Sequence, residues 1–115
     1  MSRVNYTHLT IECLGCNKEV LNTTSKVRKA LRDAASICNL HVLKEDFHKF
    51  RPQGITAYVL LSESHISVHT WPQQGFALVD ALSCSSVEID TLKKCFRQSL
   101  SAKSINVLTH AQSIP

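Results

Sequence analysis

The order of the predicted elements indicates an α+β fold, a two-layer sandwich in which two helices cover one face of a mainly antiparallel sheet. One strand and one helix come first, four strands follow in succession, and a second helix and a last strand end the chain. At 115 residues the chain is expected to be a single domain, 1–115. The second face of the sheet needs a partner, and dimerisation by pairing two sheets or joining their edges would supply it.

Residues 4–13 are the first predicted strand, because polar and apolar side chains alternate along them. Thr23 or Thr24 can cap the helix that follows, which is expected to end near residue 38. The apolar residues of this helix recur at helical spacing: Val27, Ala30, Leu31, Ala34, Ala35 and Cys38. They form the face that would pack on the sheet.

Four strands are predicted between the two helices, with turn residues at 52–54 and 72–75. These strands cover residues 41–50, 55–62, 65–71 and 76–84. Apolar side chains at helical spacing then mark the second helix: Leu92, Cys95, Phe96 and Leu100. Residues 105–109 are the last predicted strand.

Charge and hydropathy argue against nucleic acid and membranes as partners. The net charge is +4, and four basic residues lie together on the first helix: Lys26, Arg28, Lys29 and Arg32. Because no stacking aromatic side chains are interleaved with them, a solvated helix face explains them better than a nucleic-acid surface. The longest wholly apolar run, residues 58–61, is far shorter than the ~20 residues of a membrane span.

The five cysteines are expected to be reduced thiols in a cytoplasmic protein, since no apolar signal core follows Met1. Cys13 and Cys16 have the spacing of a metal or redox pair. A zinc site would need a second pair, and the other three cysteines are scattered singly. We therefore expect no metal here and interpret this pair as small buried hydrophobic residues.

The most informative segment is residues 61–72, which otherwise has the composition of a strand. It contains the hydroxyl of Ser64, the imidazoles of His65 and His69, and the carboxyl of Glu63. Buried strands seldom carry so many polar residues without a chemical reason.

Three blocks of residues are more specific than composition. They are Phe-His-Lys-Phe-Arg-Pro-Gln-Gly at 47–54, Ser-Glu-Ser-His-Ile-Ser-Val-His-Thr-Trp-Pro at 62–72, and Gly-Phe-Ala-Leu-Val-Asp at 75–80 followed by Cys84. In these blocks and their spacing the chain resembles the small prokaryotic type of S-adenosylmethionine decarboxylase proenzyme. The second block is highly specific, and the likeness extends over most of the chain.

The resemblance implies that the chain cuts itself between Glu63 and Ser64. Residues 1–63 would become the beta chain and residues 64–115 the alpha chain, which would begin with a pyruvoyl group made from Ser64. This cofactor would form a Schiff base with the substrate amine, the role that pyridoxal phosphate has in other enzymes. His69 is the expected processing base, because imidazole exchanges protons near neutral pH.

Two further residues are assigned roles by the resemblance. Cys84 would be the donor that returns a proton to the substrate after decarboxylation, and an ordinary thiol is protonated at neutral pH. Thr56 stands where the family has a serine hydroxyl that assists processing. Strict strand alternation would place Ser64 and His69 on opposite faces, so the turn at Glu63 and Ser64 must be distorted for this mechanism to work.

The implied substrate is S-adenosylmethionine, whose decarboxylated form supplies aminopropyl groups for spermidine and other polyamines. Phe50 and Trp71 can offer aromatic faces to adenine and to the sulfonium cation. Gln73 stands where the family usually has a glutamate, and it can accept a hydrogen bond from the ribose. Ser85 replaces the glycine that usually follows the cysteine, which adds bulk near Cys84.

Two other functions remain open from the sequence. Related scaffolds act as pyruvoyl-dependent decarboxylases of arginine or ornithine, which carry no ribose but need a counter-charge for the distal cation. Asp80, Glu12 and Glu45 are the candidates for that counter-charge. The other possibility is an inactive homologue that regulates an active subunit.

Overall fold

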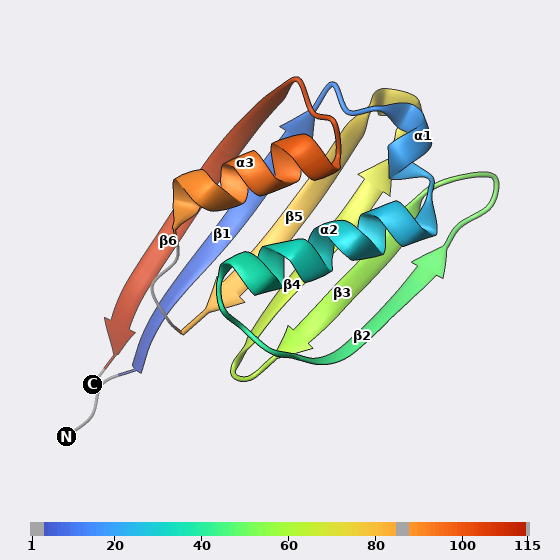
Figure 1. Cartoon of the computed structure of the whole chain (residues 1–115). Helices are drawn as coiled ribbons and strands as arrows, with labels where there is room; N and C mark the ends of the chain where they lie inside the picture. Colours follow the sequence, from blue (N-terminus) through green and yellow to red (C-terminus); the bar gives the residue numbers. More distant parts are fainter. Residues whose placement is uncertain (1–3, 85–87, 115) are drawn as a thin grey trace.

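A computed structural model describes residues 4–84 and 88–114 of the chain. Its strands form one six-stranded antiparallel sheet in the order β2-β3-β4-β5-β1-β6 (Figure 1). The strands are β1 Val4–Leu14, β2 Val42–Lys49, β3 Ile55–Leu61, β4 Ser64–Trp71, β5 Phe76–Ser83 and β6 Ser104–Ile114. The helices are α1 Lys18–Leu21, α2 Thr24–Ile37 and α3 Ile89–Ser99, with a 3-10 turn η1 at Pro72–Gln74.

Helices α2 and α3 lie across the same face of the sheet (Figure 1). The core lies between these two layers and contains the apolar side of both helices, including Val27, Leu31, Leu92 and Phe96. Alternate residues of the central strands complete it. The predicted α+β sandwich with its antiparallel sheet is therefore confirmed.

The structure adds one short helix, α1, that was not predicted, and otherwise differs from the predicted elements mainly at their ends. Thr23 is the N-cap residue of α2, but its hydroxyl donates to the carbonyl of Glu19 instead of capping the helix. The strand predicted at 105–109 is longer at both ends, because β6 pairs with β1 along the whole of Ser104–Ile114. Residues 108–114 are all exposed, so burial imposes no alternation of polar and apolar side chains there.

The other face of the sheet has no helix over it among the described residues. Strand β4 shows how the two faces differ. Ser64, Ile66, Val68 and Thr70 are buried on the helix side. The intervening residues, His65, Ser67, His69 and Trp71, lie on the uncovered face and are partly or fully exposed. This uncovered face carries most of the polar side chains that the sequence singles out.

Cys13 and Cys16 are both buried, as the sequence analysis predicts. Burial raises the pKa of Cys13 to about 12 and that of Cys16 to about 11, so both are neutral thiols at physiological pH. The Cys16 thiol donates a hydrogen bond to the carbonyl of Cys13. Among the described residues, no helix combines the length and the apolar character that crossing a membrane requires.

Candidate active site

The predicted cleavage site lies in the hairpin between β3 and β4. Leu61 pairs with Ser64, so Ser62 and Glu63 form the turn. Glu63 has a φ of 57°, a left-handed conformation that is unfavourable for a residue with a Cβ atom. Ser64 follows it and is only 6% exposed on the helix side of the sheet. The peptide bond between Glu63 and Ser64 therefore joins a strained turn residue to a buried strand residue.

Cys84 lies directly after the end of β5, beside this hairpin. Its thiol donates a hydrogen bond to the carbonyl oxygen of Glu63, with Sγ and O 3.2 Å apart. Cys84 is exposed and lines an open hollow of about 730 Å³ at the end of the sheet, together with Tyr6 and Gln112. The structure thus places a thiol on the carbonyl group that the predicted self-cleavage would attack. Ser85 lies outside the described residues.

Thr56 and His69 form a second site at the far end of the same hairpin. They are cross-strand partners, and Thr56 Oγ1 and His69 Nδ1 share a hydrogen bond of 2.9 Å. His69 is five residues along β4 from Ser64, a distance of about 16 Å at roughly 3.3 Å per residue. It also projects from the opposite face, as strand alternation predicts. Within one chain, His69 does not reach Ser64.

The two predicted aromatic residues lie beside this second site. Phe50 and Trp71 line a groove of about 320 Å³ together with Thr56, His69 and Gln53. The ring of Trp71 also lies 5.5 Å from that of Phe76, centroid to centroid. The groove therefore combines aromatic surface with the Thr56–His69 pair.

Two of the groove's features differ from the sequence-based expectation. Gln73 is exposed in η1 and is not among the residues that line the groove of its own chain. Gln53 does line the groove, although the sequence predicts only a turn at this position. Its place between Phe50 and Gly54, inside a block typical of the family, was the signal that could have identified it.

Hydrogen bonds on the helix side hold the groove in place. The buried hydroxyl of Thr70 donates to the carbonyl of Leu21 at 2.8 Å and accepts from the backbone N–H of Ile55 at 2.9 Å. Asn22 accepts from the N–H of Gly54 through its side chain. These contacts join α1 to the start of β3 and the end of β4.

The centre of the uncovered face carries a hydrogen-bond network around Asp80 that the sequence did not predict. Asp80 Oδ1 lies 2.5 Å from His8 Nε2, and Asp80 Oδ2 lies 3.2 Å from His65 Nε2. Partial burial alone would raise the pKa of Asp80, but the hydrogen bonds from His65 and His8 outweigh it and leave this pKa below its usual value. Asp80 is therefore an ionised carboxylate with a partner on each oxygen.

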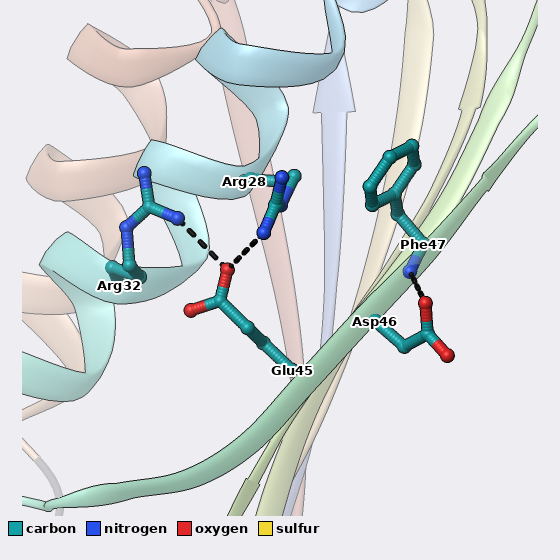
Figure 2. Close-up of polar contacts among 5 residues, drawn as sticks. All are labelled: Arg28, Arg32, Glu45, Asp46 and Phe47. Atoms are coloured by element: carbon teal, nitrogen blue, oxygen red, sulfur yellow. Dashed lines mark hydrogen bonds and ion pairs between the residues drawn. The ribbon is translucent and has the colours of Figure 1, made fainter.

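Glu45 is also paired and lies on the helix side of β2. Its Oε1 accepts from Arg28 at 2.7 Å and from Arg32 at 2.9 Å, as Figure 2 shows. The Arg28 guanidinium also lies over the ring of Phe47. Arg28 and Arg32 are thus paired with Glu45, and a third basic residue of α2, Lys29, pairs with Asp33. This agrees with a solvated helix face.

Comparison with known proteins connects this geometry to one family. The sequence profile described as S-adenosylmethionine decarboxylase matches residues 7–113. A protein of Thermodesulfovibrio yellowstonii called S-adenosylmethionine decarboxylase proenzyme is 45% identical over 78 residues, 68% of this chain and 58% of its own length. A protein of the same name from Thermosipho melanesiensis is 32% identical over 105 residues, 90% of this chain and 80% of its own.

Comparison with solved structures finds the same family. The crystal structure of the adenosylmethionine decarboxylase from Aquifex aeolicus superposes with a TM-score of 0.82 at 27% identity, covering 96% of this chain and 91% of that one. A Trypanosoma brucei chain described as an AdoMetDC-delta26 monomer gives a TM-score of 0.62 at 11% identity. It covers 91% of this chain and 45% of its own, and at that identity it supports the fold alone.

Proposed function

Because this chain belongs to the S-adenosylmethionine decarboxylase family, we propose that it is the precursor of a pyruvoyl-dependent decarboxylase of S-adenosylmethionine. The proposed product feeds polyamine synthesis, as an aminopropyl donor for spermidine. The observation that carries the proposal is the contact between the Cys84 thiol and the Glu63 carbonyl at a strained turn. We place the reaction in the cytoplasm, where thiols such as these stay reduced.

Self-cleavage begins with Ser64 Oγ, which attacks the carbonyl carbon of Glu63. The peptide C–N bond breaks, an ester forms, and the nitrogen of residue 64 becomes a free amine. A base then removes the Cα proton of residue 64, and the ester carboxylate leaves from Cβ as the end of residues 1–63. The dehydroalanine left on residues 64–115 tautomerises to an imine, and water hydrolyses this imine to the pyruvoyl group with release of ammonia.

The residues around the turn fit this chemistry. Ser64 directly follows the carbonyl that it attacks, so no other element has to bring these two groups together. The Cys84 thiol donates to the oxygen on which negative charge develops. The positive φ of Glu63 stores strain that breaking the peptide bond relieves. When present, the pyruvoyl group withdraws electrons as the substrate carboxylate leaves, and the Cys84 thiol can then return a proton.

We propose that the base at each cleavage site is His69 of a second copy of the chain. Cys84 and the scissile bond lie at one end of the sheet, and the Thr56–His69 pair lies at the other. A two-fold axis through the uncovered face would place the first site of one copy against the second site of its partner. The same packing would cover the exposed face and give two equivalent sites in a homodimer.

The groove beside His69 favours S-adenosylmethionine over a basic amino acid as the substrate. Phe50 and Trp71 provide aromatic surface for adenine and for the sulfonium cation. The alternative substrates, arginine and ornithine, need an unpaired carboxylate, and two of the three candidates are engaged. Asp80 is bonded to two histidines and Glu45 to two arginines.

The test is release of carbon dioxide from carboxyl-labelled S-adenosylmethionine by purified protein, with Ser64→Ala as the blank. Labelled arginine and ornithine are run in parallel. Release from S-adenosylmethionine alone is the expected result, and release from a basic amino acid instead would refute the proposed substrate. Gln73→Glu should lower KM for S-adenosylmethionine if residue 73 of either copy contacts the ribose; an unchanged KM would exclude that contact.

A further inference from the structure

We propose that Asp80 is a positioning residue for self-cleavage: it ties β4 to β5 through His65 and so holds the Glu63 carbonyl against Cys84. The inference rests on the proposed function, because it concerns the same cleavage site. Asp80 touches neither the scissile bond nor the thiol. It would act through the two strands that carry these groups.

The strand register shows why a link at this place matters. The pairing of β4 with β5 ends at His65, which lies opposite Leu82. Beyond it, Ser64 is registered only with Leu61 of β3, across the turn. His65 is thus the last residue of β4 that is held on both sides. Its side chain is also the last on the uncovered face before the scissile bond.

The Glu63 carbonyl and the Cys84 thiol, which must stay in contact, both lie close to the hydrogen bond between His65 and Asp80. The scissile carbonyl comes two residues before His65, and Cys84 comes four residues after Asp80. The bond from His65 Nε2 to Asp80 Oδ2 is a side-chain contact that crosses from β4 to β5 near these ends. If the two strands separate there, the Cys84 thiol moves away from the carbonyl of Glu63.

A second histidine keeps Asp80 in place. His8 Nε2 binds the other carboxylate oxygen from β1, which pairs with β5 on its far side. The carboxylate is therefore anchored to a neighbouring strand that takes no part in the hairpin. An ionised carboxylate can accept from both histidines at once, which suits it to this place.

The experiment compares the rate at which Asp80→Ala and Asp80→Asn cleave themselves after refolding, measured by denaturing intact mass. Asp46→Ala is the matched control. Asp46 lies on the same face and in the same cross-strand row, through Tyr58 and Ser67, but on the edge strand β2. Within the described part of the chain, its carboxylate accepts a hydrogen bond from the N–H of Phe47 and makes no hydrogen bond or ion pair with a neighbouring strand (Figure 2).

We expect Asp80→Ala to cleave about tenfold more slowly or worse, the kinetic equivalent of losing one hydrogen bond to a charged group. Asp80→Asn should recover much of the rate, because the amide can still bond to both histidines. Asp46→Ala should cleave like the wild type. The thermal midpoints of all variants are measured alongside, so that a general loss of folding is recognised.

Hydroxylamine separates the two stages of cleavage, since it cuts the ester without needing a base. Asp80→Ala should remain slow in hydroxylamine, because ester formation itself is impaired, whereas His69→Ala should be cut. A wild-type rate for Asp80→Ala would overturn the positioning role and leave the proposed function intact. An uncleaved wild-type chain would instead refute the proposed function, and the positioning role with it.

Discussion

Mixing two inactive variants tests whether the cleavage site is shared between two chains. Ser64→Ala lacks the nucleophile, and His69→Ala lacks the proposed base, so neither should form a pyruvoyl chain alone. In one chain these residues are separated by about 16 Å along β4, at roughly 3.3 Å per residue, and lie on opposite faces. A histidine side chain cannot span that distance. If His69 acts, it must therefore act on the Ser64 of a partner.

The expected yield follows from random pairing. When equal amounts of the two variants are refolded together, about half of the dimers should be mixed. Each mixed dimer contains one complete site, made by Ser64 of the His69→Ala chain and His69 of the other chain. About half of the His69→Ala chains, or roughly a quarter of all chains, should then be cleaved. Denaturing intact mass measures this fraction directly.

Mixing Ser64→Ala with Cys84→Ala is the control. Cys84 bonds to the carbonyl of its own chain, so a partner cannot replace it. This mixture should be cleaved no more than Cys84→Ala alone. The shared site is refuted if native mass shows mixed dimers in the first mixture while His69→Ala chains stay uncleaved. Cleavage of His69→Ala alone at the wild-type rate would refute the role of His69 itself.

Three further predictions concern stability. Thr70→Val should destabilise the fold by about 1–3 kcal/mol in urea unfolding, because it leaves a buried carbonyl and N–H without partners; an unchanged midpoint would contradict this. Glu45→Gln should cost about 1 kcal/mol at pH 7. The hydrogen bond from Arg28 is the main cause of the lowered pKa of Glu45. The ion pairs therefore stabilise the fold fully above the pKa of unfolded Glu45, near 4.5, and this stabilisation is lost as the pH falls through the lower pKa of folded Glu45. Wild type and variant should converge once the pH lies below the lowered pKa of folded Glu45, and a constant difference would exclude the ion pairs as its source. Burial raises the pKa of Cys13 from 9.0 to about 12, so its neutral form contributes fully below pH 9 and stability falls as pH rises toward 12. Cys13→Ala should flatten that alkaline loss, and an equal slope would show that burial of this thiol is not its source.

Much of the fold is readable from periodicity. Alternation along residues 64–71 predicts that Ser64 and His69 occupy opposite faces, and the structure confirms it. Helical spacing likewise identifies the buried side of α2. The far end of β6 could not be predicted, because its order comes from backbone pairing with β1 and its side chains are exposed.

The network of Asp80 shows where sequence reasoning stops. Alternation puts His8, His65 and Asp80 on one face of their strands, but it does not show which strands are neighbours. Only the order β4-β5-β1 brings the two imidazoles to one carboxylate. By contrast, the motif places Ser64 and His69 close in sequence, and the extended geometry of β4 keeps them too far apart to meet within one chain.

The most direct test of self-cleavage is a denaturing intact-mass spectrum of the purified wild-type protein. We expect two fragments, residues 1–63 and 64–115, with the second lighter than a serine-initiated chain by the mass of one ammonia. That deficit identifies the pyruvoyl group. A single full-length mass that persists after prolonged incubation, or a second fragment that still begins with serine, would contradict it.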